Sequence, residues 1–203
     1  MKTISEALRF PRVKIEIREL VKSIVLIIGF AVATAISAKI RVPLPFTPVP
    51  ITLEVLIVLL AGAMIGSIRG ALSQVLFLVF GIGGISVFAS GVIGFAALFG
   101  PTGGYLIGFV VAAYTVGKWL PESSKVYQVW LTFAFASAII LLMGFAHLVL
   151  FHIHSAREAF LLGVAPFIPG DLVKVTLATG IFTVFRKFQV GARDENKQSN
   201  GSN

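Results

Sequence analysis

Cysteine is absent from the 203-residue sequence, which excludes disulfides and thiolate metal sites. Charged residues make up only 13% of the chain, whereas soluble domains carry roughly a quarter. The sequence also lacks a Gly-x-x-x-x-Gly-Lys-Ser/Thr motif, so we do not expect the chain to hydrolyse ATP itself. Instead, 57% of the residues are hydrophobic and the mean hydropathy is +0.95, which predicts an integral membrane protein.

Six apolar segments are long enough to cross a bilayer, which requires about 20 residues. They are residues 22–40, 51–68, 70–90, 101–120, 127–151 and 159–185. Pro166 and Pro169 interrupt the last segment, so we expect its regular helix to begin near Gly170, after a shorter element. The predicted fold class is therefore all-α: a polytopic membrane protein with six transmembrane helices in one domain, residues 22–191.

Two polar ends flank this predicted domain. The basic leader, residues 1–21, either lies along the membrane surface as an amphipathic helix or is simply solvated. The first apolar run contains small residues typical of a signal-peptide cleavage site, but the charge-rich leader and the later apolar runs favour a retained span. The polar tail, residues 192–203, is predicted to be disordered.

Lysine and arginine are distributed unevenly between the two sides of the predicted bundle. One side holds 13 of the 17: Lys2, Arg9, Arg12, Lys14, Arg18, Lys22, Arg69, Lys118, Lys125, Arg186, Lys187, Arg193 and Lys197. The other side holds Lys39, Arg41 and Arg157, and Lys174 falls inside the last span. Because cytoplasmic segments carry the excess of basic residues, both termini are predicted to be cytoplasmic. The same bias accounts for the net charge of +8 without a nucleic-acid partner.

A proline-rich connector joins the first two spans on the predicted outer side. Residues 41–50 contain four prolines, so the segment is not helical, and it has too many apolar residues for a simple flexible linker. We expect either an ordered lid over the outer mouth of the bundle or a rigid connector.

Glycines and polar residues lie at the start of the fourth span, on the same predicted outer side. Residues 100–105 read Gly-Pro-Thr-Gly-Gly-Tyr. A helix start would explain the proline alone. It would not require Gly103 and Gly104, which let the backbone approach another group closely, or the adjacent Thr102 and Tyr105.

An acidic and a basic residue lie at the start of the regular part of the sixth span. Asp171 and Lys174 stand three residues apart, which places them on one helix face. Ionisable groups at membrane depth are costly and usually functional. The alternative is that Asp171 caps the helix while Lys174 extends to the membrane surface.

Small residues predict close helix packing at several places. Two series of glycines recur every four residues, at positions 62, 66, 70 and 100, 104, 108. Ala31 and Ala35 share one face of the first span, which serves either internal packing or a partner helix. Gly81 to Gly84 resembles part of a dinucleotide-binding motif but lies in an apolar span, so it is better explained by packing.

No metal or cofactor site is expected. His147, His152 and His154 have loose ligand-like spacing, but no carboxylate partner is evident in the sequence around them. The predicted topology offers a different kind of site: spans two, four and six all begin at the outer face. Three positive helix ends therefore point toward one mouth, which suits a small solute carrying a carboxylate.

Three segments carry a resemblance to a known family. They are residues 43–53 (Pro-Leu-Pro-Phe-Thr-Pro-Val-Pro-Ile-Thr-Leu), 100–106 (Gly-Pro-Thr-Gly-Gly-Tyr-Leu) and 169–174 (Pro-Gly-Asp-Leu-Val-Lys). In this order and spacing they resemble the BioY family, the biotin-specific substrate-capture subunits (S components) of energy-coupling-factor (ECF) transporters. The similarity runs from about the first span to the end of the sixth, and the three motifs together are specific.

The resemblance implies a six-helix protein of a prokaryotic plasma membrane that binds biotin from outside. It also implies docking on a transmembrane coupling subunit driven by two ABC ATPases, with no catalytic residue, metal or cofactor in this chain. The implied substrate-binding residues are Asp171, Lys174, Tyr105, Thr102, Gly103 and Gly104. The implied docking residues are Ala31 and Ala35.

One residue and one short segment depart from the pattern of that family. Glu54 stands where a glutamine is expected after Ile-Thr-Leu, and residues 85–91 read Ile-Ser-Val-Phe-Ala-Ser-Gly in place of Leu-Pro-Val-Phe-Ala-Gly-Gly. If Glu54 faces the pocket, its charge opposes a carboxylate ligand unless it is paired, which leaves the ligand orientation open. Two other function classes also stay open: a solitary facilitator or channel without an ATPase, and a small intramembrane enzyme.

Overall fold

The computed structural model describes residues 17–120 and 125–200, with side chains described through residue 189. Its helices are α1 Ile17–Ser37, α2 Glu54–Ile65, α3 Ser67–Ile82, α4 Ala96–Phe99, α5 Gly103–Trp119, α6 Val126–Phe151, α7 Ala156–Gly163 and α8 Ile168–Asn200. Two strands, β1 Arg41–Val42 and β2 Ile51–Thr52, pair antiparallel at the two ends of the proline-rich connector. This small strand pair was not predicted from the sequence.

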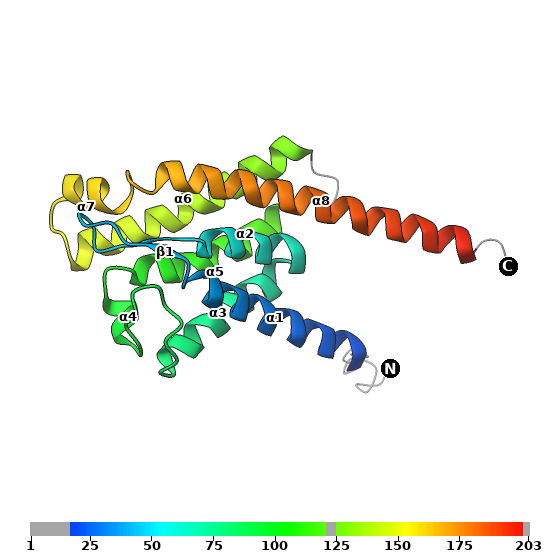
Figure 1. Cartoon of the computed structure of the whole chain (residues 1–203), viewed down its shortest axis with the longest axis horizontal. Helices are drawn as coiled ribbons and strands as arrows, with labels where there is room; N and C mark the ends of the chain where they lie inside the picture. Colours follow the sequence, from blue (N-terminus) through cyan, green and yellow to red (C-terminus); the bar gives the residue numbers. More distant parts are fainter. Residues whose placement is uncertain (1–16, 121–124, 201–203) are drawn as a thin grey trace, which may run out of the picture.

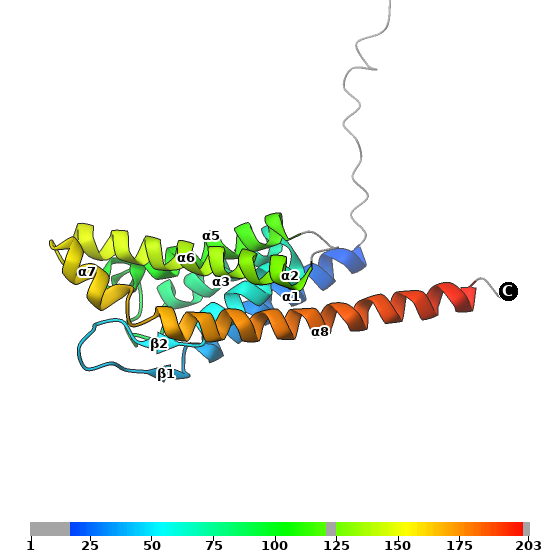
Figure 2. The ribbon, with the colours of Figure 1, turned by 90° about the horizontal axis from the view of Figure 1, so that it is seen from above.

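The longer helices form a bundle with α5 at its centre. Helix α5 packs against α2, α3 and α6, while α1 packs on α3 and α8 packs on both α2 and α6. The start of α1 and the end of α8 lie at the same end of the molecule (Figures 1 and 2). The strand pair, α4 and α7 gather at the opposite end.

Each of the six predicted apolar segments overlaps with one of the longer helices, but the helices differ in length. Three are long and apolar enough to cross a membrane: Ile17–Ser37, Val126–Phe151 and the Ile168–Gln189 part of α8. Helices α2 and α3 are shorter apolar helices. The outward side chains along the bundle are large and hydrophobic, as expected for a surface in contact with lipid rather than water. The chain is therefore a membrane protein.

The first glycine series does not form one helix face, as its spacing had suggested. Gly66 adopts a positive φ of 86° and ends α2, so the chain turns directly into α3. Gly62 and Gly70 then face each other across the turn, and a Cβ on Gly70 would lie 2.9 Å from the Gly62 Cα. The close approach was predicted correctly, but it joins two helices at a turn.

The predictions for the two polar ends, the leader and the tail, compare differently with the structure. Most of the predicted leader, residues 1–16, lies outside the described residues. Helix α8 begins at Ile168, after the shorter α7 predicted before it, and continues to Asn200. The prediction of a disordered tail from residue 192 is therefore corrected up to Asn200. Residues 192–200 contain no glycine or proline and are rich in strong helix formers, so low hydrophobicity alone did not indicate disorder.

Candidate functional site

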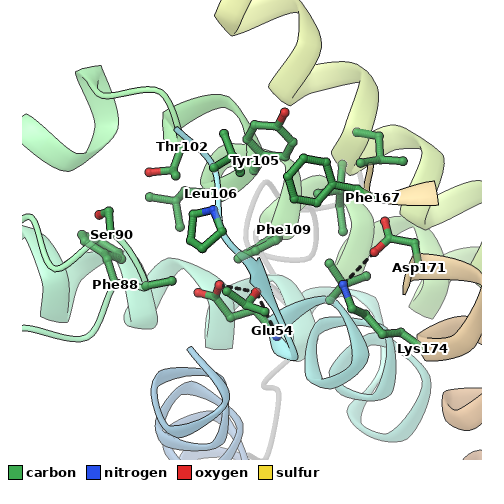
Figure 3. Close-up of a pocket in the computed structure, with 17 residues that line it drawn as sticks. Glu54, Phe88, Ser90, Thr102, Tyr105, Leu106, Phe109, Phe167, Asp171 and Lys174 are labelled. Atoms are coloured by element: carbon green, nitrogen blue, oxygen red, sulfur yellow. Dashed lines mark hydrogen bonds and ion pairs between the residues drawn. The ribbon is translucent and has the colours of Figure 1, made fainter. Parts of the chain in front are cut away.

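A small polar cavity lies inside the bundle, between the proline-rich connector, the start of α2, the loop after α3, and helices α5, α6 and α8. Its cavity volume is about 50 Å³. The polar side chains that line it are Thr52, Glu54, Ser90, Thr102, Tyr105, Asp171 and Lys174. Figure 3 shows six of these residues around the cavity, on segments far apart in the sequence: Glu54, Ser90, Thr102, Tyr105, Asp171 and Lys174.

Asp171 and Lys174 form a buried ion pair at this cavity. Lys174 Nζ lies 2.8 Å from Asp171 Oδ1, and each residue is only 5% exposed. Ser137 on α6 donates a hydrogen bond of 2.9 Å to the other carboxylate oxygen. The Asp171 carboxylate therefore bonds side chains of α6 and α8, which argues against the helix-cap alternative. Because a buried charge is tolerated only when paired and hydrogen-bonded, the two residues depend on each other.

Tyr105 and Thr102 form a second part of the wall, from the start of α5. The Tyr105 hydroxyl donates a 2.6 Å hydrogen bond to the Gly163 carbonyl at the end of α7, and its ring packs on Phe167 at 6.2 Å between centroids. Thr102 lines the cavity at the N-cap position of α5, where its side chain makes no capping hydrogen bond. Four of the predicted substrate-binding residues thus meet around one cavity.

Gly103 and Gly104 do not line this cavity. A Cβ on Gly103 would collide with the Leu98 carbonyl, and a Cβ on Gly104 would collide with His147 and the Met143 carbonyl on α6. Their implied role in substrate binding stays a prediction, whereas the close backbone approach that they were expected to allow is present. They allow α5 to pack tightly against the preceding turn and against α6, which places Thr102 and Tyr105 indirectly.

Glu54 is a site residue that the sequence raised only as a departure from a pattern. It begins α2, is 4% exposed, and accepts a 2.7 Å hydrogen bond from Thr52 through Oε2. Its other oxygen, Oε1, is buried and has no hydrogen-bond partner among the residues that the structure describes. The cavity therefore contains one unsatisfied carboxylate oxygen.

Three phenylalanines complete the apolar wall, and sequence reasoning missed all of them. Phe88 comes from the loop after α3, Phe109 from α5 and Phe167 from the segment before α8. Phe109 lies one helical turn after Tyr105, so the spacing could have indicated it. Phe88 and Phe167 carry no such local signal, because only the fold brings them to α5.

A larger apolar groove opens on the outer surface between α6, α7 and α8. Its volume is about 410 Å³, and its lining residues include Ser137 and Asp171, so Asp171 lines both this groove and the polar cavity. Exposed Leu142 and Leu172 lie on its walls, as on the other lipid-facing surfaces. We regard the smaller cavity as the candidate site because convergent polar groups, rather than volume, give a site its specificity.

The predicted docking face on α1 is largely internal. Ala31 is 0% exposed and belongs to the hydrophobic core, and Ala35 is half-buried against that core. The burial of Ala31 supports the alternative of internal packing, since α1 packs on α2 and α3, and docking on this face stays a prediction. In residues 17–120 and 125–200, no group of three or more His, Cys, Asp or Glu could hold a metal ion.

Comparisons with known proteins identify the family of this chain. The model of the BioY family matches residues 6–189. A relative from Thermotoga maritima named "Biotin transporter BioY" is 33% identical over 73% of this chain and 88% of its own length. A relative from Pyrococcus horikoshii named "Probable biotin transporter BioY" is 38% identical over 77% of this chain and 91% of its own length.

A solved structure also matches the fold. It is described as the S-component for biotin from an ECF-type ABC transporter, and it superposes with a TM-score of 0.76 at 25% sequence identity. The match covers 84% of this chain and 93% of that chain. The resemblance inferred from the three sequence motifs is thereby confirmed, and this chain belongs to the BioY family.

Proposed function

We propose that this chain is the biotin-binding subunit of an ECF-type vitamin transporter and captures biotin from the extracytoplasmic side of a prokaryotic plasma membrane. The observation that carries the proposal is the buried Asp171–Lys174 pair facing a cavity with aromatic walls. Biotin has a ureido ring with two N–H donors and one carbonyl acceptor, and an aliphatic chain that ends in a carboxylate. An aspartate can accept an N–H, and a lysine can donate to a carbonyl or carboxylate.

The walls suit the rest of that ligand. Phe88, Phe109 and Phe167 supply apolar surface for the fused rings and the aliphatic chain, which bind by losing contact with water. A few placed polar groups in a mostly apolar pocket are typical of small-molecule sites. We therefore propose that the polar side chains orient biotin in the pocket, and that the aromatic side chains cover most of its surface.

Biotin can enter only if the cavity opens. Its volume of about 50 Å³ is well below the roughly 300–1,000 Å³ of ordinary ligand pockets. The proline-rich connector is the segment that we propose moves, because Val49 and Pro50 line the cavity directly. Thr47 holds it in place by donating a 2.7 Å hydrogen bond to the Leu162 carbonyl on α7.

Thr47→Val tests whether this connector acts as a lid. The substitution removes the hydrogen bond to the Leu162 carbonyl and the 3.2 Å hydrogen bond that the Thr47 hydroxyl accepts from the Val49 N–H. Each ordinary hydrogen bond is worth about 0.5–1.5 kcal/mol, so biotin should dissociate at least about 2- to 10-fold faster. Dissociation of labelled biotin from the purified protein measures this rate. The matched control is Thr132→Val, whose hydroxyl donates to Gln128 within its own helix. Equal rates in both variants would favour a rigid connector.

We also propose that both termini are cytoplasmic and that the chain crosses the membrane six times. The start of α1 and the end of α8 lie at one end of the bundle (Figure 1), which supports an even number of crossings. The side with 13 of the 17 basic residues would be the cytoplasmic one. Reporter domains fused to either terminus should therefore report the cytoplasm, and an external C-terminus would contradict this topology.

Transport would need partners, since the sequence has no P-loop. We propose a transmembrane coupling subunit and two ABC ATPases, with docking near the half-buried Ala35 on α1. Biotin uptake should occur in cells that co-express this chain with such a coupling module and should depend on its ATPases. Equal uptake with ATPase-inactive partners would favour a solitary facilitator.

A further inference from the structure

Glu54 lies at the cavity in an electrostatic situation unlike that of Asp171. Asp171 has both carboxylate oxygens engaged, by Lys174 and by Ser137. Glu54 has only Oε2 engaged, by the Thr52 hydroxyl. Its Oε1 is buried at the cavity without a partner in the described part of the chain (Figure 3). A buried acceptor without a hydrogen bond is costly, so native proteins rarely keep one unless something binds it.

The polar groups lining the cavity define which ligand group can bind there. Two carboxyl groups and one ammonium group face it, so acceptor oxygens outnumber the cationic donors. A ligand carboxylate placed beside Glu54 would be repelled and would leave Oε1 without a donor. A neutral or cationic N–H donor would satisfy that oxygen. Lys174 gives one N–H to Asp171 and has others that can donate to a ligand carbonyl.

A ureido group matches this pattern, because it has an N–H donor next to a carbonyl acceptor. Positive charge lies at the side of the cavity near the proline-rich connector. Arg41 on β1 donates to the carbonyl of the cavity-lining Ala89, and Lys39 donates to the Ser86 carbonyl in the same loop. Both cations are exposed, so a ligand carboxylate is better tolerated at that side.

We propose that Glu54 determines specificity in this transporter subunit by accepting an N–H from the ureido end of the ligand, which directs the ligand carboxylate toward the Arg41 side. This inference rests on the proposed function, since it names the contact that biotin makes. It also gives a role to the acidic residue found where a glutamine was expected. A carboxylate at this position favours a cationic N–H donor more strongly than an amide does.

The test uses four related ligands and two substitutions at residue 54. The ligands are biotin, 2-iminobiotin, whose ring is a cyclic guanidinium at neutral pH, and the two mono-N-methylated biotins. Glu54→Gln keeps the side-chain shape and one acceptor oxygen, so it reports on charge. Glu54→Ala removes the acceptor. Gly29→Ala is the control, because no atom of the described residues lies within 4 Å of a Cβ at that position.

Affinities measured by titration calorimetry in nanodiscs should show two effects. The affinity for 2-iminobiotin relative to that for biotin should fall about tenfold or more in Glu54→Gln, because a charge-assisted hydrogen bond becomes an ordinary one. The loss of the ligand carbonyl that faces Lys174 is the same in both proteins and cancels from this comparison. Methylating the N–H that faces Glu54 should weaken binding about tenfold to the unsubstituted protein and little to Glu54→Ala. The control should match the unsubstituted protein throughout.

The outcomes separate this inference from the proposed function. Two results together would overturn the inference alone, since biotin would still bind. The first is that Glu54→Gln keeps the relative affinity for 2-iminobiotin and biotin of the unsubstituted protein. The second is that N-methylation weakens biotin binding equally in Glu54→Ala and in the unsubstituted protein. Failure of the unsubstituted protein to bind biotin would overturn both. If Glu54→Ala does not fold, the nearly isosteric Glu54→Gln still decides the charge effect.

Discussion

Lys174→Ala should weaken biotin binding by tenfold or more and should also lower the stability of the protein. The substitution removes a ligand donor and leaves Asp171 as an unpaired charge at 5% exposure. Stranding one member of a buried ion pair costs about 3–5 kcal/mol. Biotin affinity by calorimetry and the unfolding temperature in detergent measure the two effects. Lys187→Ala is the matched control, because Lys187 lies on the same helix but is exposed.

A double substitution separates binding from stability at this pair. Asp171→Asn with Lys174→Met removes both charges at once, so no unpaired charge stays buried, and a buried pair replaced in this way is often neutral for stability. We expect the double variant to recover most of the unfolding temperature but not biotin binding. Recovery of both would remove the pair from the site. Asp171→Asn alone should weaken binding, whereas a mere helix cap would tolerate it.

Gly104→Ala should destabilise the bundle by about 3 kcal/mol or more. The added Cβ would overlap with the His147 Cβ and with the Met143 carbonyl, and a backbone oxygen inside α6 cannot move aside cheaply. Overpacking a tight core typically costs about 1–3 kcal/mol, and a clash with rigid backbone lies at the upper end. The unfolding temperature of the purified protein measures the loss.

A matched glycine shows whether the effect is local. Gly29→Ala adds the same methyl group to an exposed face of α1, with no atom within 4 Å in the part of the chain that the structure describes. It should be neutral or slightly stabilising, because alanine is the better helix former. Equal unfolding temperatures for the two variants would mean that α5 and α6 do not pack as closely as described.

Local patterns predicted the helices well, because a long apolar run in a membrane can satisfy its backbone only as a helix. Pro166 and Pro169 correctly indicated a short element before α8. The turn at Gly66 was missed, since spacing alone cannot distinguish one continuous glycine face from two helices that meet at a turn. The strand pair was also missed, because its two members are only two residues long.

The site was predicted only where its residues share a local motif. Asp171 and Lys174 share one helix face, and Thr102 and Tyr105 open one helix, so spacing indicated both pairs. Phe88 and Glu54 reach the cavity through contacts between segments far apart in the chain, which no local pattern records. Ala31 shows why the sequence left two alternatives open: a face of small residues that suits a partner helix is equally suited to packing inside the chain's own bundle.

Equilibrium binding of a panel of vitamins to the purified protein tests the central claim most directly. The account predicts one site that binds biotin, with much weaker or no binding of thiamine, riboflavin and other vitamins that lack a ureido ring. It also predicts that Lys174→Ala loses this binding while the exposed control Lys187→Ala keeps it. Preference for another vitamin, or full biotin affinity in Lys174→Ala, would contradict the account.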